Sequence, residues 1–148
     1  MISFDTSVLV YAADRDNSLR HQQAAERRER AMRAGNCIQT LQSLAEFCNV
    51  LTRKIRVAPE RAEAFVTAWR AVFPVEAASA ADLDHAIRAV RDYKLAFWDA
   101  LLWATVRRAG VALLVTEDLQ DGRVIEGVRI ANPFAPANAA VIDAALRF

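Results

Sequence analysis

Short apolar runs alternate with longer stretches of mixed polarity along this chain. Runs of four to six apolar residues bounded by turn-forming residues are typical of buried strands. The expected strands are residues 2–4, 36–40, 72–75, 112–116 and 128–131. The apolar run at 8–11 is expected to continue the first strand beyond the acidic residue at position 5. The third of these runs is interrupted by Pro74, which cannot donate to a ladder.

Between these runs, apolar residues recur with the spacing of amphipathic helices. Ser43 is expected to cap the helix at 44–54, and Gly35 to end the helix at 21–34. Ser79 begins another helix, with Asp82 placed to complete a capping box. The expected helices are residues 21–34, 44–54, 59–71, 79–93, 98–108 and a terminal one at 138–146.

Strands separated by helices favour parallel pairing with helical crossovers. We therefore expect a three-layer α/β fold, with a central parallel sheet of about five strands flanked by helices. No repeat or long linker divides the chain, so residues 1–148 are expected to form one domain. Ligands of such folds bind outside the carboxyl ends of the strands, at the point where the strand order reverses.

Composition narrows the class of protein only a little. The apolar fraction of 54% suffices for one core, and the net charge of +1 indicates no overall attraction to nucleic acid or membrane. This net charge is still compatible with a local rim of basic residues around an acidic centre, which an RNA-cutting enzyme could have. The two cysteines, Cys37 and Cys48, lack the partners of a zinc site and are expected to pack with reduced thiols in a cytoplasmic protein.

Four acidic residues at element boundaries are the main functional signal: Asp5, Glu46, Asp99 and Asp118. Asp5 and Asp118 follow expected strands, so their carboxylates are expected to meet at one edge of the sheet. Like charges that close stay ionised only with a cation between them, and carboxylate oxygens suit Mg²⁺ or Mn²⁺. The pattern therefore predicts a divalent metal site.

Each acid also has an ordinary structural explanation. Glu46 follows Ser43 at the spacing of a capping box, Asp99 could stabilise a helix N-terminus, and Asp118 could open a turn. Asp5 is hardest to explain in this way, because a carboxylate within an apolar run costs free energy unless it is paired or metal-bound. The joint placement of all four favours the functional interpretation.

Four segments that contain these acids resemble the PIN-domain family, and more narrowly the VapC-like toxin ribonucleases of toxin–antitoxin pairs. The segments are Phe-Asp-Thr-Ser-Val-Leu-Val-Tyr-Ala from position 4, Gln-Ser-Leu-Ala-Glu-Phe-Cys-Asn-Val-Leu from 42, Phe-Trp-Asp-Ala-Leu-Leu-Trp-Ala from 97 and Leu-Val-Thr-Glu-Asp-Leu from 114. The resemblance extends from residue 2 to about residue 134, and the segment 136–148 lies beyond it as a C-terminal extension.

The resemblance implies that Asp5, Glu46, Asp99 and Asp118 hold the metal, supported by the hydroxyl side chains of Thr6, Ser7 and Thr116. Family members usually have another acid where this chain has Gln120, so the neighbouring Asp121 is a further metal-ligand candidate. The resemblance also implies a homodimer and a cognate antitoxin protein. The expected activity is metal-dependent RNA cleavage that inhibits translation or growth.

Within that activity, Asp5 and Asp99 are expected to bind one or two metal ions directly. Glu46 would bind an ion or orient the attacking water, and Asp118 would act through water. Single-stranded RNA is the expected substrate, because its unstacked bases are accessible. The candidate RNA-binding residues are Arg15, Arg20, Arg107 and Arg108.

Three other classes of protein are alternatives to a PIN-domain ribonuclease. A phosphotransferase of the haloacid dehalogenase type needs a second acid at the position of Ser7, and a receiver domain needs an acidic pair in that region and a late lysine. The sequence has neither arrangement. An inactive PIN-like module that binds RNA or a protein partner stays open, because metal affinity depends on fine geometry.

Overall fold

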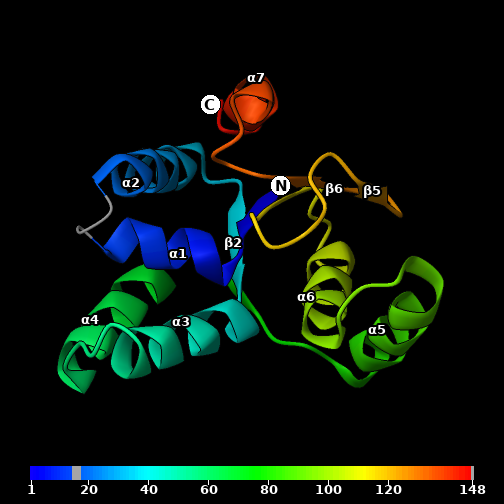
Figure 1. Ribbon diagram of the computed structural model, residues 1–148, viewed down its shortest axis with the longest axis horizontal. Helices are drawn as coiled ribbons and strands as arrows, with labels where there is room; N and C mark the ends of the chain where they lie inside the picture. Colours follow the sequence, from blue (N-terminus) through cyan, green and yellow to red (C-terminus); the bar gives the residue numbers. More distant parts are fainter. Residues whose placement is uncertain (15–17, 148) are drawn as a thin grey trace.

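The computed structural model describes residues 1–14 and 18–147, which form a sheet between two groups of helices (Figure 1). The strands are β1 (Ile2–Phe4), β2 (Cys37–Thr40), β3 (Val75–Glu76), β4 (Leu113–Val115), β5 (Val124–Ile125) and β6 (Val128–Ala131). Their order in the sheet is β3-β2-β1-β4-β6-β5. All neighbouring pairs are parallel except β5 with β6. The expected α/β fold with a mainly parallel sheet is confirmed.

The helices connect and cover these strands. They are α1 (Thr6–Ala13), α2 (Ser18–Ala34), α3 (Leu41–Arg53), α4 (Pro59–Arg70), α5 (Ala80–Tyr93), α6 (Phe97–Arg108) and α7 (Ala139–Ala145), with a short 3₁₀ turn at Pro136–Asn138. The Ser79–Asp82 capping box and the positive φ angle of Gly35 (63°) occur as expected. None of the helices in the described ranges is long and apolar enough to cross a membrane.

Each face of the sheet packs against its own group of helices. Ile2 and Phe4 of β1 lie in a core with residues of α1, α2, α3 and α4, whereas Leu114 and Ile130 lie in a second core with α5 and α6. Figure 1 shows the two helix groups on opposite sides of the sheet. Ile142 of the C-terminal segment belongs to the first core, so this segment is part of the packed structure.

The run at 8–11 was expected as a strand, and this prediction is wrong. It lies in α1, which contacts α2 and α3, and only Asp5 separates this helix from β1. Hydrophobicity alone does not distinguish a buried strand from a buried helix in so short a run. The side chain of Asp5 accepts a hydrogen bond from the amide of Thr6 and so caps the helix.

Two further details differ from the sequence-based prediction. Helix α3 begins at Leu41, and its N-terminus is capped by Thr40 instead of Ser43. The capping-box explanation of Glu46 is therefore wrong. Strand β5 was not expected, because it has only two residues; it pairs with β6 through Glu126 and Gly127, whose positive φ angles of 44° and 86° suit a tight hairpin.

The order of the strands places a topological switch point between β1 and β4. The chain passes from β1 to β2 on one side, whereas β4 and β6 lie on the other side. Asp5 directly follows β1 and Thr116 directly follows β4. The carboxyl ends of these two central strands therefore open into the crevice where α/β proteins bind ligands.

Candidate metal-binding active site

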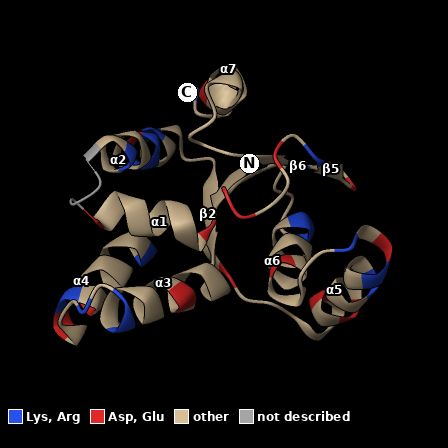
Figure 2. Cartoon of the chain, viewed as in Figure 1, with Lys and Arg blue, Asp and Glu red and all other residues tan. Residues whose placement is uncertain are grey.

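All four predicted acids line one pocket at this crevice. Asp5 caps α1, Glu46 lies in the second turn of α3, Asp99 in the first turn of α6, and Asp118 in the loop after β4. The pocket has a volume of about 370 Å³. Its lining residues are Asp5, Thr6, Ser7, Val10, Tyr11, Gln42, Glu46, Val50, Lys54, Asp99, Leu102 and Asp118. Figure 2 shows acidic segments of α3, α6 and the loop after β4 around the centre of the molecule.

Asp5 is the most deeply buried acid of the pocket, with 6% of its surface exposed. Its Oδ1 accepts a hydrogen bond of 2.6 Å from the Thr6 amide, and its Oδ2 accepts one of 2.7 Å from the Thr116 hydroxyl. Burial raises the pKa of Asp5 from 3.8 to about 6, against the lowering effect of these two hydrogen bonds. The charges of Asp118 and Glu46 raise this pKa further.

Glu46 is held in place by both of its carboxylate oxygens. The Thr6 hydroxyl donates to Oε2 at 3.2 Å, and the Gln42 amide donates to Oε1 at 2.9 Å. The same Gln42 nitrogen donates to the main-chain oxygen of Trp98 at 2.9 Å. Because Trp98 precedes Asp99, Gln42 connects the helix that carries Glu46 to the helix that carries Asp99.

Asp99 and Asp118 complete the electrostatic coupling of the site. Burial raises the pKa of Asp99, and the charges of Asp118 and Glu46 raise it further. Asp118 is exposed, and its amide donates to the Thr116 hydroxyl at 3.0 Å. Thr116 therefore contacts both Asp5 and Asp118. Repulsion from the neighbouring carboxylates disfavours the charged forms of Asp5 and Asp99 unless a cation neutralises it.

The donor chemistry of the pocket fits a hydrated divalent cation. Its oxygen ligands are carboxylates, which hard cations prefer. Ser7 lines the same pocket, and its hydroxyl is buried with no hydrogen-bond partner among the described residues. Within the described residues, no three acidic, histidine or cysteine side chains are placed closely enough to enclose one ion. Mg²⁺ commonly binds through one or two carboxylates and keeps several waters, which suits this wider spacing.

The structure does not bring Asp121 to the pocket. Its Oδ1 accepts hydrogen bonds of 2.8 Å from the Asn132 amide and 2.6 Å from the Asn138 side chain. These bonds lower the pKa of Asp121 and connect its loop to the segment after β6. Asp121 therefore lies outside the lining of the acid pocket, and its role as a metal ligand stays a prediction.

Of the four candidate RNA-binding arginines, Arg15 lies outside the described residues. Arg20 donates hydrogen bonds of 2.6 Å to the Tyr11 hydroxyl and 2.7 Å to Glu117. Its guanidinium also lies 4.7 Å from the centre of the Phe134 ring. Arg20 thus connects α1, the loop after β4 and the segment after β6, and both hydrogen bonds come from its Nη1.

Arg107 and Arg108 lie in the last turn of α6, about two helical turns from Asp99. Arg107 pairs with Glu126 at 2.7 Å. Arg108 pairs with the buried Asp82 at 2.9 Å and thereby joins α6 to the start of α5. The structure therefore does not bring these two arginines together with the acids, and both have structural partners.

Lys54 is the basic side chain that lines the acid pocket, and sequence reasoning did not select it. It follows α3, is exposed, and forms no ion pair with the described residues. Glu46, Val50 and Lys54 recur at intervals of four and all line the pocket. This periodicity was the available signal, because it places Lys54 on the same helix face as Glu46.

Comparisons with known proteins agree with the fold. A family model described as PIN domain matches residues 2–124. The sarcin-ricin loop cleaving toxin VapC20 of Mycobacterium tuberculosis is 23% identical, with a TM-score of 0.61 over 77% of this chain and 87% of that chain. Rickettsia felis VapBC2, solved with a promoter DNA fragment, is 14% identical with a TM-score of 0.66 over 89% of this chain and 98% of that chain. DNA-bound VapBC of Salmonella typhimurium is 22% identical with a TM-score of 0.64, over 89% and 97% of the two chains. A search of curated protein sequences found no match.

Proposed function

Because the chain belongs to the PIN domain family, we propose that it is a divalent-metal-dependent endoribonuclease, the toxin of a toxin–antitoxin pair. The observation that carries this proposal is the convergence of Asp5, Glu46, Asp99 and Asp118 on one pocket at the switch point of the sheet. A carboxylate pocket next to a groove suits phosphodiester hydrolysis, in which a divalent ion neutralises developing negative charge.

The relatives of similar fold support the choice of RNA and of a toxin. One of them is a toxin that cleaves the sarcin-ricin loop, and others were solved as toxin–antitoxin complexes. By analogy, we assign to this protein a homodimeric state, a cognate antitoxin and a cytoplasmic location. Cleavage of RNA by the free toxin would inhibit translation or growth.

The pocket residues have distinct proposed roles. Asp5 and Asp99 would hold Mg²⁺ or Mn²⁺ directly, and Asp118 would act through water. When bound, the ion lowers the pKa of the attacking water and stabilises the leaving oxygen. Glu46, fixed by Thr6 and Gln42, orients the attacking water or binds the ion. Ser7 lines the same pocket and would support this set through its buried hydroxyl, which has no hydrogen-bond partner among the described residues.

The hydrogen bond from Thr116 favours the charged form of Asp5, which is the form that binds a cation. Thr6 has a similar supporting role, because its amide binds Asp5 and its hydroxyl binds Glu46. These two threonines act through the acids and are positioning residues in this proposal.

One observation favours the alternative of an inactive module that binds RNA or a protein. No three potential ligand side chains of the described residues are close enough to enclose an ion. An active enzyme of this geometry would therefore hold the ion through one or two carboxylates and water. Metal titration of the purified protein distinguishes the two functions.

The test is cleavage of a panel of labelled single-stranded RNAs by purified protein with Mg²⁺, with Mn²⁺ or with EDTA. Asp5→Asn serves as the inactive variant, and Asp84→Asn, on the exposed face of α5, serves as the matched control. We expect metal-dependent cleavage by the wild type and by Asp84→Asn, and none by Asp5→Asn. Metal binding without cleavage of any RNA, or cleavage that persists in Asp5→Asn, would contradict the proposal.

A further inference from the structure

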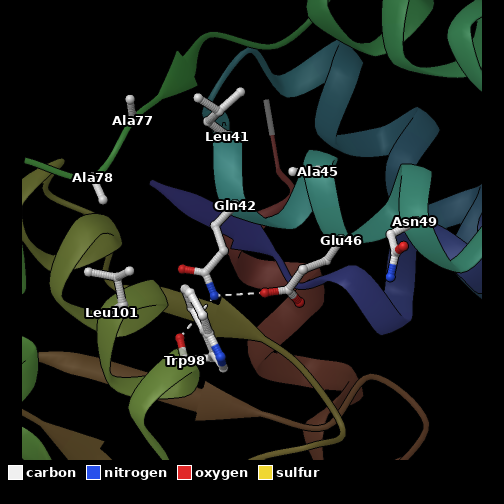
Figure 3. A pocket seen from close by; sticks show the side chains of 9 residues that line it. All are labelled: Leu41, Gln42, Ala45, Glu46, Asn49, Ala77, Ala78, Trp98 and Leu101. Atoms are coloured by element: carbon white, nitrogen blue, oxygen red, sulfur yellow. Dashed lines mark hydrogen bonds between the residues drawn. The ribbon is translucent and has the colours of Figure 1, made fainter.

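A second groove lies directly beside the acid pocket. Its volume of about 750 Å³ falls within the range of roughly 300–1,000 Å³ that is common for small-molecule ligand sites. It lies between the start of α3, the loop after β3 and the start of α6 (Figure 3). Its lining residues are Leu41, Gln42, Ala45, Glu46, Asn49, Ala77, Ala78, Trp98 and Leu101. Gln42 and Glu46 line both cavities, so the groove is continuous with the acid pocket.

Trp98 is the most conspicuous side chain of this groove. It is 63% exposed, whereas Trp69 and Trp103 are buried in the two cores at 3% and 1%. Exposing an indole ring in this way forgoes the large hydrophobic gain of burying it, so a surface tryptophan next to a candidate active site points to a ligand. Its main chain is fixed by the hydrogen bond from Gln42, which leaves the ring at the groove (Figure 3).

Building on the proposed ribonuclease function, we propose that this groove binds one unstacked base of the RNA substrate, stacked on the ring of Trp98. The base belongs to a nucleotide next to the phosphate that the acid pocket receives. Base stacking on an aromatic side chain tolerates different sequences, because every base has a π-face. This site therefore determines where single-stranded RNA is held.

The charges around the two cavities support a base in this position. Among the residues that the structure describes, no lysine or arginine lines the groove, and Glu46 is the one charged residue of its lining. Lys54 lies beyond Glu46 on the same face of α3 and lines the acid pocket. The phosphates of the bound RNA are therefore drawn towards Lys54 and the metal, and the uncharged base occupies the groove.

The polar groups of the groove also suit a base. Gln42 donates to Glu46 and to Trp98, but its Oε1 is buried and has no hydrogen-bond partner. A buried acceptor without a donor costs free energy, which the amino group or ring N–H of a base would recover. Gln42 thereby connects the base site to Glu46, so binding of the base would affect the position of that carboxylate.

A protein segment is the main alternative occupant, and the charge of Glu46 argues against it. A protein chain that filled the groove would remove water from Glu46, and the groove offers no basic residue among the described residues to compensate, so that chain would have to bring its own cation. RNA approaches together with the divalent ion that neutralises this carboxylate. The electrostatics therefore favour RNA, and the following experiment measures both alternatives.

The test is RNA binding in the non-cleaving Asp5→Asn background, measured by fluorescence anisotropy with labelled oligoadenylate and oligouridylate of equal length. Trp98→Ala is compared with Trp98→Phe and with Ile87→Ala, which removes an exposed apolar side chain of α5 outside the groove. We expect Trp98→Ala to weaken binding of oligoadenylate by roughly 5- to 100-fold, the usual effect of losing one stacked base. Trp98→Phe should keep most of the affinity, and Ile87→Ala should bind as the parent does.

Tryptophan fluorescence and molar mass complete the design. RNA should quench the emission of the parent protein, and Trp98→Phe should abolish that quenching, because the other two tryptophans are buried.

Unchanged RNA affinity in Trp98→Ala would overturn the proposal. A lower oligomeric mass of Trp98→Ala in light scattering would instead identify the groove as an interface between copies. Wild-type protein that cleaves no RNA would contradict the ribonuclease function, whereas cleavage that is insensitive to Trp98→Ala would contradict the base site alone.

Discussion

The hydroxyl of Thr116 donates a hydrogen bond of 2.7 Å to Oδ2 of Asp5 and so joins the carboxyl ends of β4 and β1. The same hydroxyl accepts a hydrogen bond from the Asp118 amide at 3.0 Å. One uncharged side chain therefore orients two of the four acids. Partners that orient metal ligands in this way typically change metal affinity by about 10–100-fold when they are mutated.

Replacing Thr116 with valine should weaken metal binding. The substitution removes a bond that lowers the pKa of Asp5, so this pKa should rise above its value of about 6. It also releases the amide of Asp118. We expect the affinity for Mn²⁺ at neutral pH to fall roughly tenfold, as measured by isothermal titration calorimetry. Thr116→Ser keeps the hydroxyl and should restore most of the affinity; equal affinity in all three proteins would exclude this role of Thr116.

The stability of the metal-free protein should decrease as pH rises through the range of the Asp5 titration. The pKa of Asp5 is about 6 in the folded protein and 3.8 in the reference state, so the folded state binds the extra proton between these values. The stabilisation is present in full below about pH 3.8 and is lost as pH rises through about 6. The total change is about 3 kcal/mol.

Chemical denaturation between pH 4 and pH 8 in EDTA measures this effect. Asp5→Asn carries no titrating group at this position, so its stability should depend less on pH over the same range. Mg²⁺ should stabilise the wild type more above pH 6 than below it, because the metal competes with the proton for the carboxylate. Identical pH profiles of the two proteins in EDTA would show that Asp5 titrates normally.

Substitution of Arg20 separates a structural role from an RNA-binding role. Arg20→Ala removes the bonds to Tyr11 and Glu117 and the contact with Phe134. Because Arg20 and Glu117 are partly solvated, we expect a loss of roughly 1 kcal/mol in the free energy of unfolding. The dependence of RNA affinity on salt should stay as in the wild type. A shallower salt dependence at unchanged stability would restore the sequence-based expectation that Arg20 binds RNA.

Substitution of Lys54 should change RNA binding, in contrast to substitution of Arg20. Lys54→Gln keeps the length of the side chain and removes a charge at the edge of the acid pocket. We expect weaker RNA binding and a decrease of about 0.7 in the slope of log affinity against log salt, the value for one phosphate contact to a single strand. Lys94→Gln is the matched control at the end of α5 and should leave the slope unchanged. Equal slopes for both variants would remove Lys54 from the RNA-binding surface.

The sequence predicted the acids of the pocket better than its basic residues, for a physical reason. Asp5 and Asp118 follow strands, and parallel strands bring their carboxyl ends to one edge of the sheet whatever their lengths. The direction of an arginine side chain depends on its partners, such as Glu117 for Arg20, which is distant in the sequence. No local pattern contains that information.

The same distinction between local sequence signals and distant contacts explains why some helices and strands differ from those expected. Helix α5 has a cap and a capping box within its own sequence, and its start was predicted at the correct residue. The first residues of α1 are all apolar or small, so the local sequence leaves helix and strand equally favourable. Here the tertiary contacts with α2 and α3 decide the structure.

The hydrogen bond between Asp5 and Thr116 spans 111 positions of the chain. During translation the amino-terminal part leaves the ribosome first, and β1 has no β4 beside it until Leu113–Val115 has been made. A nascent chain that ends before Asp118 lacks part of the proposed catalytic centre, however well its first helices have folded. The proposed activity can therefore arise only after Asp118 has been synthesised.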